Sequence, residues 1–172
     1  MLTPRLELIP HPPEASRALI AGESQYEQTI GYAPCEGLRD LMASPDISPA
    51  YLAELERATE FDPWKHGFAI VHRDTRTIIG MASFKGPPTE GMVEIAYGLA
   101  PLQWGKGLAT EAAQALIRFA IADERVRLVR AHTLPEPNAS TKVLTKCGLA
   151  FIGEVIDPED GLVWRWEKSE FV

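Results

Sequence analysis

The chain has 172 residues, of which 45% are hydrophobic and 24% charged, a composition that predicts one globular domain spanning residues 1–172. No apolar run approaches the roughly 20 residues of a membrane span and the N-terminus lacks a secretory-signal pattern, so we expect a cytoplasmic protein without a membrane partner. The net charge of −7 argues against nucleic acid as a partner; it would attract a cationic substrate such as an amine, or serve solubility alone.

The first third of the chain predicts one strand and two helices. Alternating residues at 5–9 predict the strand, and the prolines that open residues 12–23 suit the first turn of a helix. Residues 31–48 are punctuated by Pro and Gly, so we expect them to be irregular. Ser48 is a suitable N-cap for a second helix over residues 48–60.

The remainder of the chain alternates between strands and helices. Runs rich in β-forming residues predict strands at residues 67–73, 77–85, 91–101, 127–134, 149–156 and 161–169. An amphipathic pattern predicts a helix over residues 105–122, and a shorter helix over 138–148 has Asn138 as its N-cap and Gly148 as its stop. This order predicts a mixed α/β fold in which antiparallel strands flank a parallel crossover.

A glycine-flanked lysine, "GKG" at residues 105–107, lies between a predicted strand and the longest predicted helix. The first turn of a helix has N–H groups without intrahelical partners and carries partial positive charge, and glycine has no Cβ to keep a ligand away. The turn is therefore a candidate anion-binding nest for phosphate, to which Lys106 could add a charge. Two glycines would also make a tight turn for structural reasons alone.

Two common nucleotide-binding patterns do not fit this turn. A P-loop requires Ser or Thr directly after the lysine, but Gly107 occupies that position. The dinucleotide fingerprint needs a third glycine where Thr110 stands, and it belongs near the start of a parallel sheet. A nucleotide-binding protein of another fold is therefore disfavoured.

Four segments resemble the GNAT superfamily of acyl-CoA-dependent N-acyltransferases, and more narrowly its ribosomal-protein N-terminal acetyltransferase type (RimJ/RimL-like). They are "TPRLEL", "EIAYGLAPLQWGKGLATEA", "PNASTKVLTKCGLAFIGE" and the closing strand pair, in the family's order. The resemblance spans almost the whole chain, and the pair "WGKGLATEA" and "NAS…KCGL" is quite specific. It implies a mostly antiparallel sheet of about seven strands flanked by helices, with parallel central strands splayed at the cofactor cleft.

By resemblance, the ligand is acetyl-CoA, with its pantetheine arm between the fourth and fifth strands of the family, its pyrophosphate on the glycine turn and no metal. Trp104 stands where the superfamily usually has Gln or Arg, which removes the side-chain contact expected there and leaves the backbone contacts. The cofactor-binding residues that the resemblance implies are Ile95, Tyr97, Leu99, Trp104, Gly105, Lys106, Gly107, Leu108, Ala109, Thr110 and Asn138.

The implied reaction needs a base, because an amine near its free pKa is mostly protonated at pH 7. Glu94 lies on the strand face of small residues beside the proposed cleft and matches the acidic position that some family members use as base; alternatively it is an idle, solvated carboxylate. Strand N–H groups near residues 95–99 could stabilise the oxyanion. Ser140 is a candidate general acid, although a thiol is already a fair leaving group.

The other reactive residues have simpler interpretations. No metal site or disulfide framework is expected from the spacing of His66, His72, His132, Cys35 and Cys147, and Cys147 is interpreted as a buried, inert thiol. His132 lies on the strand that lines the cleft and could touch the substrate. The acidic turn at residues 157–161 could attract an ammonium group or be an ordinary charged turn.

These observations predict an acetyl-CoA-dependent N-acetyltransferase that acts on a primary amine, either a protein N-terminus or an amine-bearing small molecule. The alternative is a non-catalytic acyl-CoA-binding module that keeps the nest without turnover. Glu94 separates the two, because only the enzyme needs its carboxylate. Both a monomer and a homodimer are compatible with the sequence.

Overall fold

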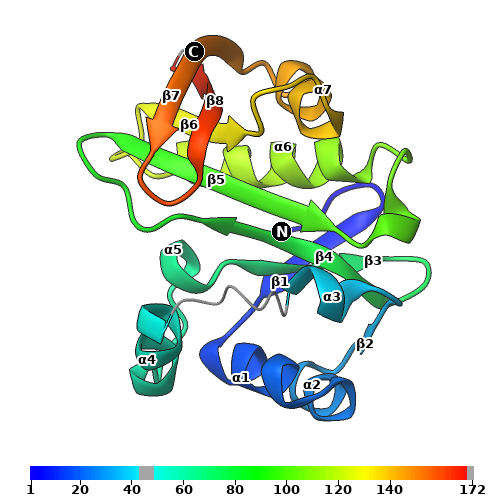
Figure 1. Cartoon of the computed structure of the whole chain (residues 1–172). Coiled ribbons are helices and arrows are strands. Elements are labelled where there is room, and N and C mark those ends of the chain that lie inside the picture. The colour runs from blue at the N-terminus through cyan, green and yellow to red at the C-terminus, as the bar shows by residue number, and fades with distance from the viewer. Residues whose placement is uncertain (43–48, 170–172) are drawn as a thin grey trace.

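A twisted sheet forms the centre of the computed structural model, which describes residues 1–42 and 49–169 (Figure 1). The strands are β1 (Leu6–Pro10), β2 (Ala33–Pro34), β3 (Phe68–His72), β4 (Thr77–Phe84), β5 (Met92–Leu99), β6 (Leu128–Thr133), β7 (Ala150–Asp157) and β8 (Gly161–Lys168). They follow the order β1-β3-β4-β5-β6-β8-β7, and the two-residue β2 pairs with β4 outside this order. This mostly antiparallel mixed sheet confirms the predicted fold class.

The parallel pair β5 and β6 diverges soon after it forms. Its ladder joins Met92 with Leu128, Val93 with Val129 and Glu94 with Arg130, and no pair follows along the described strands. On its other edge β5 stays paired with β4 as far as Leu99. The sheet is therefore split along β5 from Glu94 onward, as expected for splayed central strands.

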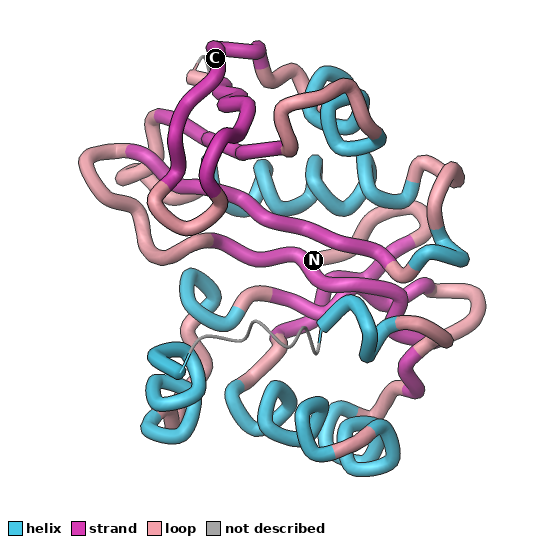
Figure 2. The backbone as a smooth tube through the Cα atoms, in the orientation of Figure 1, coloured by secondary structure: helices cyan, strands magenta, loops and turns pink. Residues whose placement is uncertain are grey.

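Helices cover both faces of the sheet (Figure 2). They are α1 (Pro13–Ala21), α2 (Glu23–Ile30), α3 (Leu38–Met42), α4 (Pro49–Arg57), α5 (Pro63–His66), α6 (Leu108–Ile121) and α7 (Ala139–Lys146), with a 3-10 turn η1 at Pro101–Gln103. Figure 1 shows α6 and α7 on one side and α1, α2, α3 and α4 on the other. A large apolar cluster lies between the sheet and α6, and a smaller one beneath α1 and α2.

Helix α6 follows its predicted amphipathic pattern but begins three residues later than expected, at Leu108. Gly105 and Gly107 have φ values of +74° and +77°, in the left-handed region, so they form the turn that precedes the helix. Ala112, Leu116 and the other small apolar residues of one face are buried against the sheet. The glycines therefore shape the entry into the helix and do not belong to it.

The prediction that residues 31–48 are irregular is wrong for the described part, because β2 and α3 lie there. Leu38 of α3 is fully buried in the smaller apolar cluster, a tertiary contact that stabilises a helix too short for periodicity to reveal. Helices α2 and α5 were also absent from the expectations. Ser48, the predicted N-cap, lies outside the described residues, and α4 extends over Pro49–Arg57.

Candidate active site

The gap between β5 and β6 contains a cavity of about 280 Å³. Its walls carry the predicted base, the predicted acid and the predicted substrate contact, namely Glu94, Ser140 and His132, together with Tyr97, Lys85 and Asp160. These residues come from β4–β5, β6, α7 and the β7–β8 turn, so only the folded sheet brings them together. The split in the sheet is therefore also the place where the candidate chemistry gathers.

The backbone of β5 presents a row of polar groups to this gap. Glu94 accepts a hydrogen bond from the N–H of Lys85 and the N–H of Ala100 donates to Ile79, so these residues direct their backbone groups toward β4. Backbone groups alternate in direction along a strand, so those of Ile95, Tyr97 and Leu99 point toward β6, where the ladder has ended. The side chains of Ile95 and Leu99 are buried in the core, which leaves the backbone as their contribution to the cleft.

Glu94 lies in a network of hydrogen bonds and is only 14% exposed, so it is not a freely solvated carboxylate. Its Oε1 atom accepts from Nδ1 of His132 at 3.0 Å and from Nζ of Lys85 at 3.2 Å. The other ring nitrogen of His132, Nε2, accepts from Nε of Arg165 at 3.4 Å, so a neutral imidazole donates through Nδ1. His132 therefore holds Glu94 in place, a contact that sequence reasoning missed.

Tyr97 and Ser140 form a hydroxyl pair on the α7 side of the same cavity, with 3.0 Å between their oxygens. Burial raises the pKa of Tyr97 to about 12, although the hydrogen bond with Ser140 acts in the opposite direction. A phenol with this pKa keeps its proton near neutral pH and can donate it in a hydrogen bond. Beside Ser140, the predicted general acid, the structure thus has a second hydroxyl donor, Tyr97, which the sequence predicted only as a cofactor contact.

The turn before α6 presents backbone N–H groups to solvent. Within the described part of the chain, the N–H groups of residues 105–110 meet no acceptor, and they surround the N-terminus of a 14-residue helix. Trp104 differs, because its N–H donates to the carbonyl of Pro101. The nest therefore begins one residue later than the predicted set, at Gly105, and its donors suit a phosphate group.

The side chains of Trp104 and Lys106 brace this turn. The indole Nε1 of Trp104 donates to the carbonyl of Leu99 at 2.7 Å, while the ring itself is 63% exposed. Nζ of Lys106 donates to the carbonyl of Leu102 and lies 3.2 Å from Oε1 of Gln103. In this structure both side chains stabilise the path of the chain from β5 into α6.

Arg5 and Thr3 tie the N-terminal strand to the turn, which sequence reasoning missed. Nη1 of Arg5 donates to the carbonyl of Lys106 at 2.8 Å, and its Nε pairs with Glu111 Oε2 at 2.8 Å. Thr3 donates to the other oxygen of Glu111. Burial opposes ionisation of Glu111, but these hydrogen bonds outweigh it and lower its pKa. The only signal in the sequence was the arginine of "TPRLEL".

Asn138 is the N-cap of α7, as predicted, within a full capping box. Its Oδ1 accepts from the N–H of Thr141 and its Nδ2 donates to the carbonyl of Glu136. Both polar atoms of the amide are therefore engaged inside the chain. The structure does not place this side chain among the residues that line the cavity between β5 and β6.

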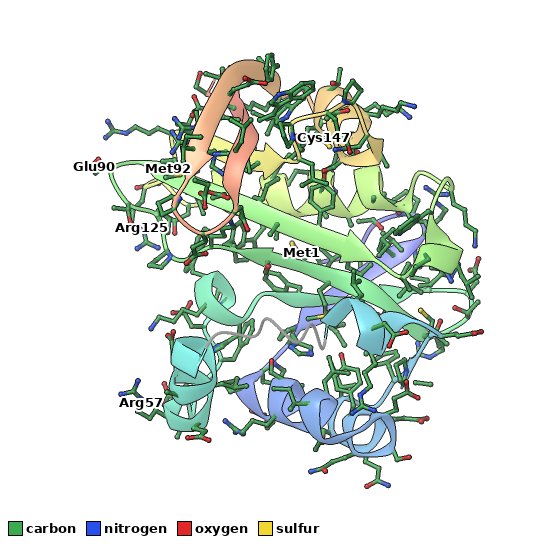
Figure 3. The ribbon with its side chains drawn as sticks, in the orientation of Figure 1. Met1, Arg57, Glu90, Met92, Arg125 and Cys147 are labelled. Atoms are coloured by element: carbon green, nitrogen blue, oxygen red, sulfur yellow. The ribbon has the colours of Figure 1, made fainter. Side chains whose placement is uncertain are left out.

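Cys147, labelled in Figure 3, follows α7 and is buried, with its thiol 3.8 Å from the Thr110 carbonyl of α6. Burial raises the pKa of this thiol to about 11, so it is unreactive near neutral pH. Among residues 1–42 and 49–169, no three His, Cys, Asp or Glu side chains gather as they would around a metal ion. No helix of the same residues has the length and apolar character to cross a membrane.

A sequence profile of the acetyltransferase (GNAT) domain matches residues 5–150. An uncharacterized N-acetyltransferase of Bacillus licheniformis, p20, is 33% identical over 104 residues, which are 60% of this chain and 54% of that protein. Another, YjdG of Bacillus subtilis strain 168, is 37% identical over 89 residues, 51% of each protein. This chain thus spans about half the length of the curated relatives that it matches.

The fold is shared with a solved structure of RimL, a ribosomal L7/L12 alpha-N-protein acetyltransferase in complex with coenzyme A. The two superpose with a TM-score of 0.64 at 15% sequence identity, over 98% of this chain and 96% of RimL. At this identity the likeness concerns the architecture and not the acceptor.

Proposed function

The chain belongs to the GNAT acetyltransferase domain family, and from this premise we propose that it is an N-acetyltransferase that transfers the acetyl group of acetyl-CoA to a primary amine. The acceptor is a protein N-terminus or a small amine. One observation carries the proposal: a single cavity between the split strands holds a carboxylate on one side and a pair of hydroxyls on the other.

The groups of the cleft fit acetyl-CoA as the donor. Its pyrophosphate would meet the N–H groups of residues 105–110, which have no acceptor among the described residues. Its pantetheine arm would run along the backbone groups of β5 that face β6 and hydrogen-bond to them, as a neighbouring strand does in a sheet. Acetyl-CoA supplies an activated thioester, and the protein supplies position, a base and hydrogen-bond donors.

Glu94 is the proposed base. An acceptor amine arrives mostly protonated at neutral pH, so a carboxylate at the cavity wall removes its proton before or during attack on the thioester carbon. Glu94 Oε1 is held by His132, while no hydrogen bond joins Oε2 to a described residue, so Oε2 is the proposed acceptor for the substrate proton. The collapse of the tetrahedral intermediate then breaks the C–S bond.

The oxyanion and the thiolate require donors on the other side of the cleft. The N–H groups of β5 that point toward β6 are placed to stabilise the developing oxyanion. The Tyr97 and Ser140 hydroxyls, 3.0 Å apart, are placed to donate to the leaving thiolate. The two proton transfers thus occur at opposite walls, so the base and the acid do not compete for the same proton.

Release of free thiol from acetyl-CoA tests the proposal. The purified protein is incubated with acetyl-CoA and a panel of primary amines that includes alanine-initiated peptides, alaninamide and polyamines, and thiol formation is followed together with the acetylated product. Amine-dependent thiol release is expected. Stabilisation by CoA without thiol release for any amine would favour the non-catalytic acyl-CoA-binding module instead; at about 100 times Kd this stabilisation is roughly 2.7 kcal/mol.

A further inference from the structure

Lys85 stands beside the proposed base in the position of an amine substrate. It follows β4 directly, and its Nζ lies 3.2 Å from Glu94 Oε1 and 3.2 Å from Asp160 Oδ2. Its side chain is 39% exposed, so it can leave this position without crossing the core. Two carboxylates from distant parts of the chain therefore hold one ammonium group at the cavity wall.

Lys85 also lines two cavities. The cavity of about 280 Å³ between β5 and β6 contains Glu94, and a second of about 470 Å³ lies between β4 and the helices α1, α4 and α5. Among the described lining residues, Lys85 is the one that the two cavities share. Lys85 therefore borders both the cavity that contains Glu94 and the larger one.

From this geometry we infer that Lys85 is a built-in competitor, whose ammonium group fills the place of the acceptor's ammonium group until the acceptor displaces it. The inference rests on the proposed function, because it assigns a cationic amine to the Glu94 and Asp160 carboxylates. Two ammonium groups held by the same two carboxylates would repel each other, so the acceptor and Lys85 cannot both occupy the site without loss of affinity. The acceptor binds as Lys85 swings toward solvent.

The protonation of Lys85 agrees with a competitor and not with an acceptor. Burial lowers the pKa of this lysine, but the charge of Glu94 and the hydrogen bonds to Asp160 and Glu94 outweigh burial and raise it. A protonated amine has no lone pair for attack on a thioester. While it is held by the two carboxylates, Lys85 is therefore protected from acetylation.

The test measures binding of alaninamide, a cationic primary amine, to the CoA-loaded protein by titration calorimetry. K85M removes the competing charge and keeps a side chain of similar length, so we expect alaninamide to bind about fivefold more tightly than to the wild type. K85R keeps the charge and should bind no more tightly than the wild type. K146M removes a lysine charge at the end of α7 and should leave the affinity unchanged.

Equal affinity of K85M and wild type, or the same gain in K146M, would overturn the inference. So would acetylation of Lys85 itself on incubation with acetyl-CoA alone, detected by peptide mass mapping. Because binding is measured without turnover, this result is separate from the proposed function. If K85M binds alaninamide more tightly but the protein releases no thiol, the inference about Lys85 stands and the proposed acetyltransferase activity does not.

Discussion

The proposed phosphate nest follows β5 and the carboxylate cluster includes Glu94 of that strand, but the two are built in opposite ways. The nest is a continuous run, residues 105–110, and the groups proposed to bind the ligand are backbone N–H groups. The carboxylate cluster is Lys85, Glu94, His132 and Asp160, side chains from four separate places in the chain. The nest should therefore depend on backbone conformation and tolerate side-chain change, whereas the cluster should depend on side-chain chemistry.

The largest effect is expected in the carboxylate cluster. E94Q keeps the size of the side chain but removes the proposed base, so turnover should fall by about 10²–10⁴-fold in the thiol-release assay. The affinity for CoA should not change, because the nest is untouched. E154Q, a matched change on β7 where Glu154 contacts Trp164, should keep full activity. Equal turnover of E94Q and wild type would remove Glu94 from the mechanism.

The second prediction concerns how the free energy of unfolding depends on pH. His11 lines the larger cavity, and burial, followed by the charge of His66, lowers its pKa from 6.5 to about 4. The unfolded chain takes up the proton below pH 6.5 while the folded chain does not, so stability falls as pH drops from 6.5 toward 4. The loss between pH 7 and pH 5 should be about 2 kcal/mol in urea unfolding.

The H11Q variant serves as the comparison for this pH dependence. It lacks the titrating ring, so its free energy of unfolding should change less between pH 7 and pH 5 than that of the wild type. Its stability at pH 7 will be lower, because His11 bonds to both Ser16 and Tyr26, but the prediction concerns the slope. Parallel slopes for the two proteins would contradict it.

A change of backbone conformation tests the nest. Gly107 has φ +77°, which a β-branched residue adopts only with strain, so G107V should weaken CoA binding by about tenfold or more. G31V is the matched control, since Gly31 has φ +80° at the end of α2 with open space around it. Both variants should lose stability, but only G107V should lose the thermal shift with CoA.

The smallest effect is expected where a side chain supports the nest from outside. R5A removes the hydrogen bond to the Lys106 carbonyl and the pair with Glu111, and should weaken CoA binding by about threefold to fivefold. R125A removes an arginine that pairs with Asp123 in its own loop and should leave the CoA affinity unchanged. Equal losses in the two variants would indicate a general effect of charge.

Local patterns were sufficient for much of the fold. The alternating runs predicted the long strands, and small apolar residues at helical spacing predicted α6. Asn138 was recognisable as a cap because its amide bonds to the chain three residues later. Helices α2 and α5 escaped prediction since α2 buries only Tyr26 and α5 is four residues long. Such segments are stabilised by what they pack against.

The candidate site divides along the same line. The amino-acid sequence by itself determined the candidate nest, because two glycines and a following helix specify a set of N–H groups within one short run. Only the tertiary structure decided the partners of Glu94 and Lys85: Lys85 and Asp160 are 75 residues apart, and Glu94 and His132 are 38 apart, and both pairs meet through the sheet and its turns. The conformation of a short backbone segment depends on the residues next to it in the sequence, whereas contacts between distant side chains exist only after the chain has folded.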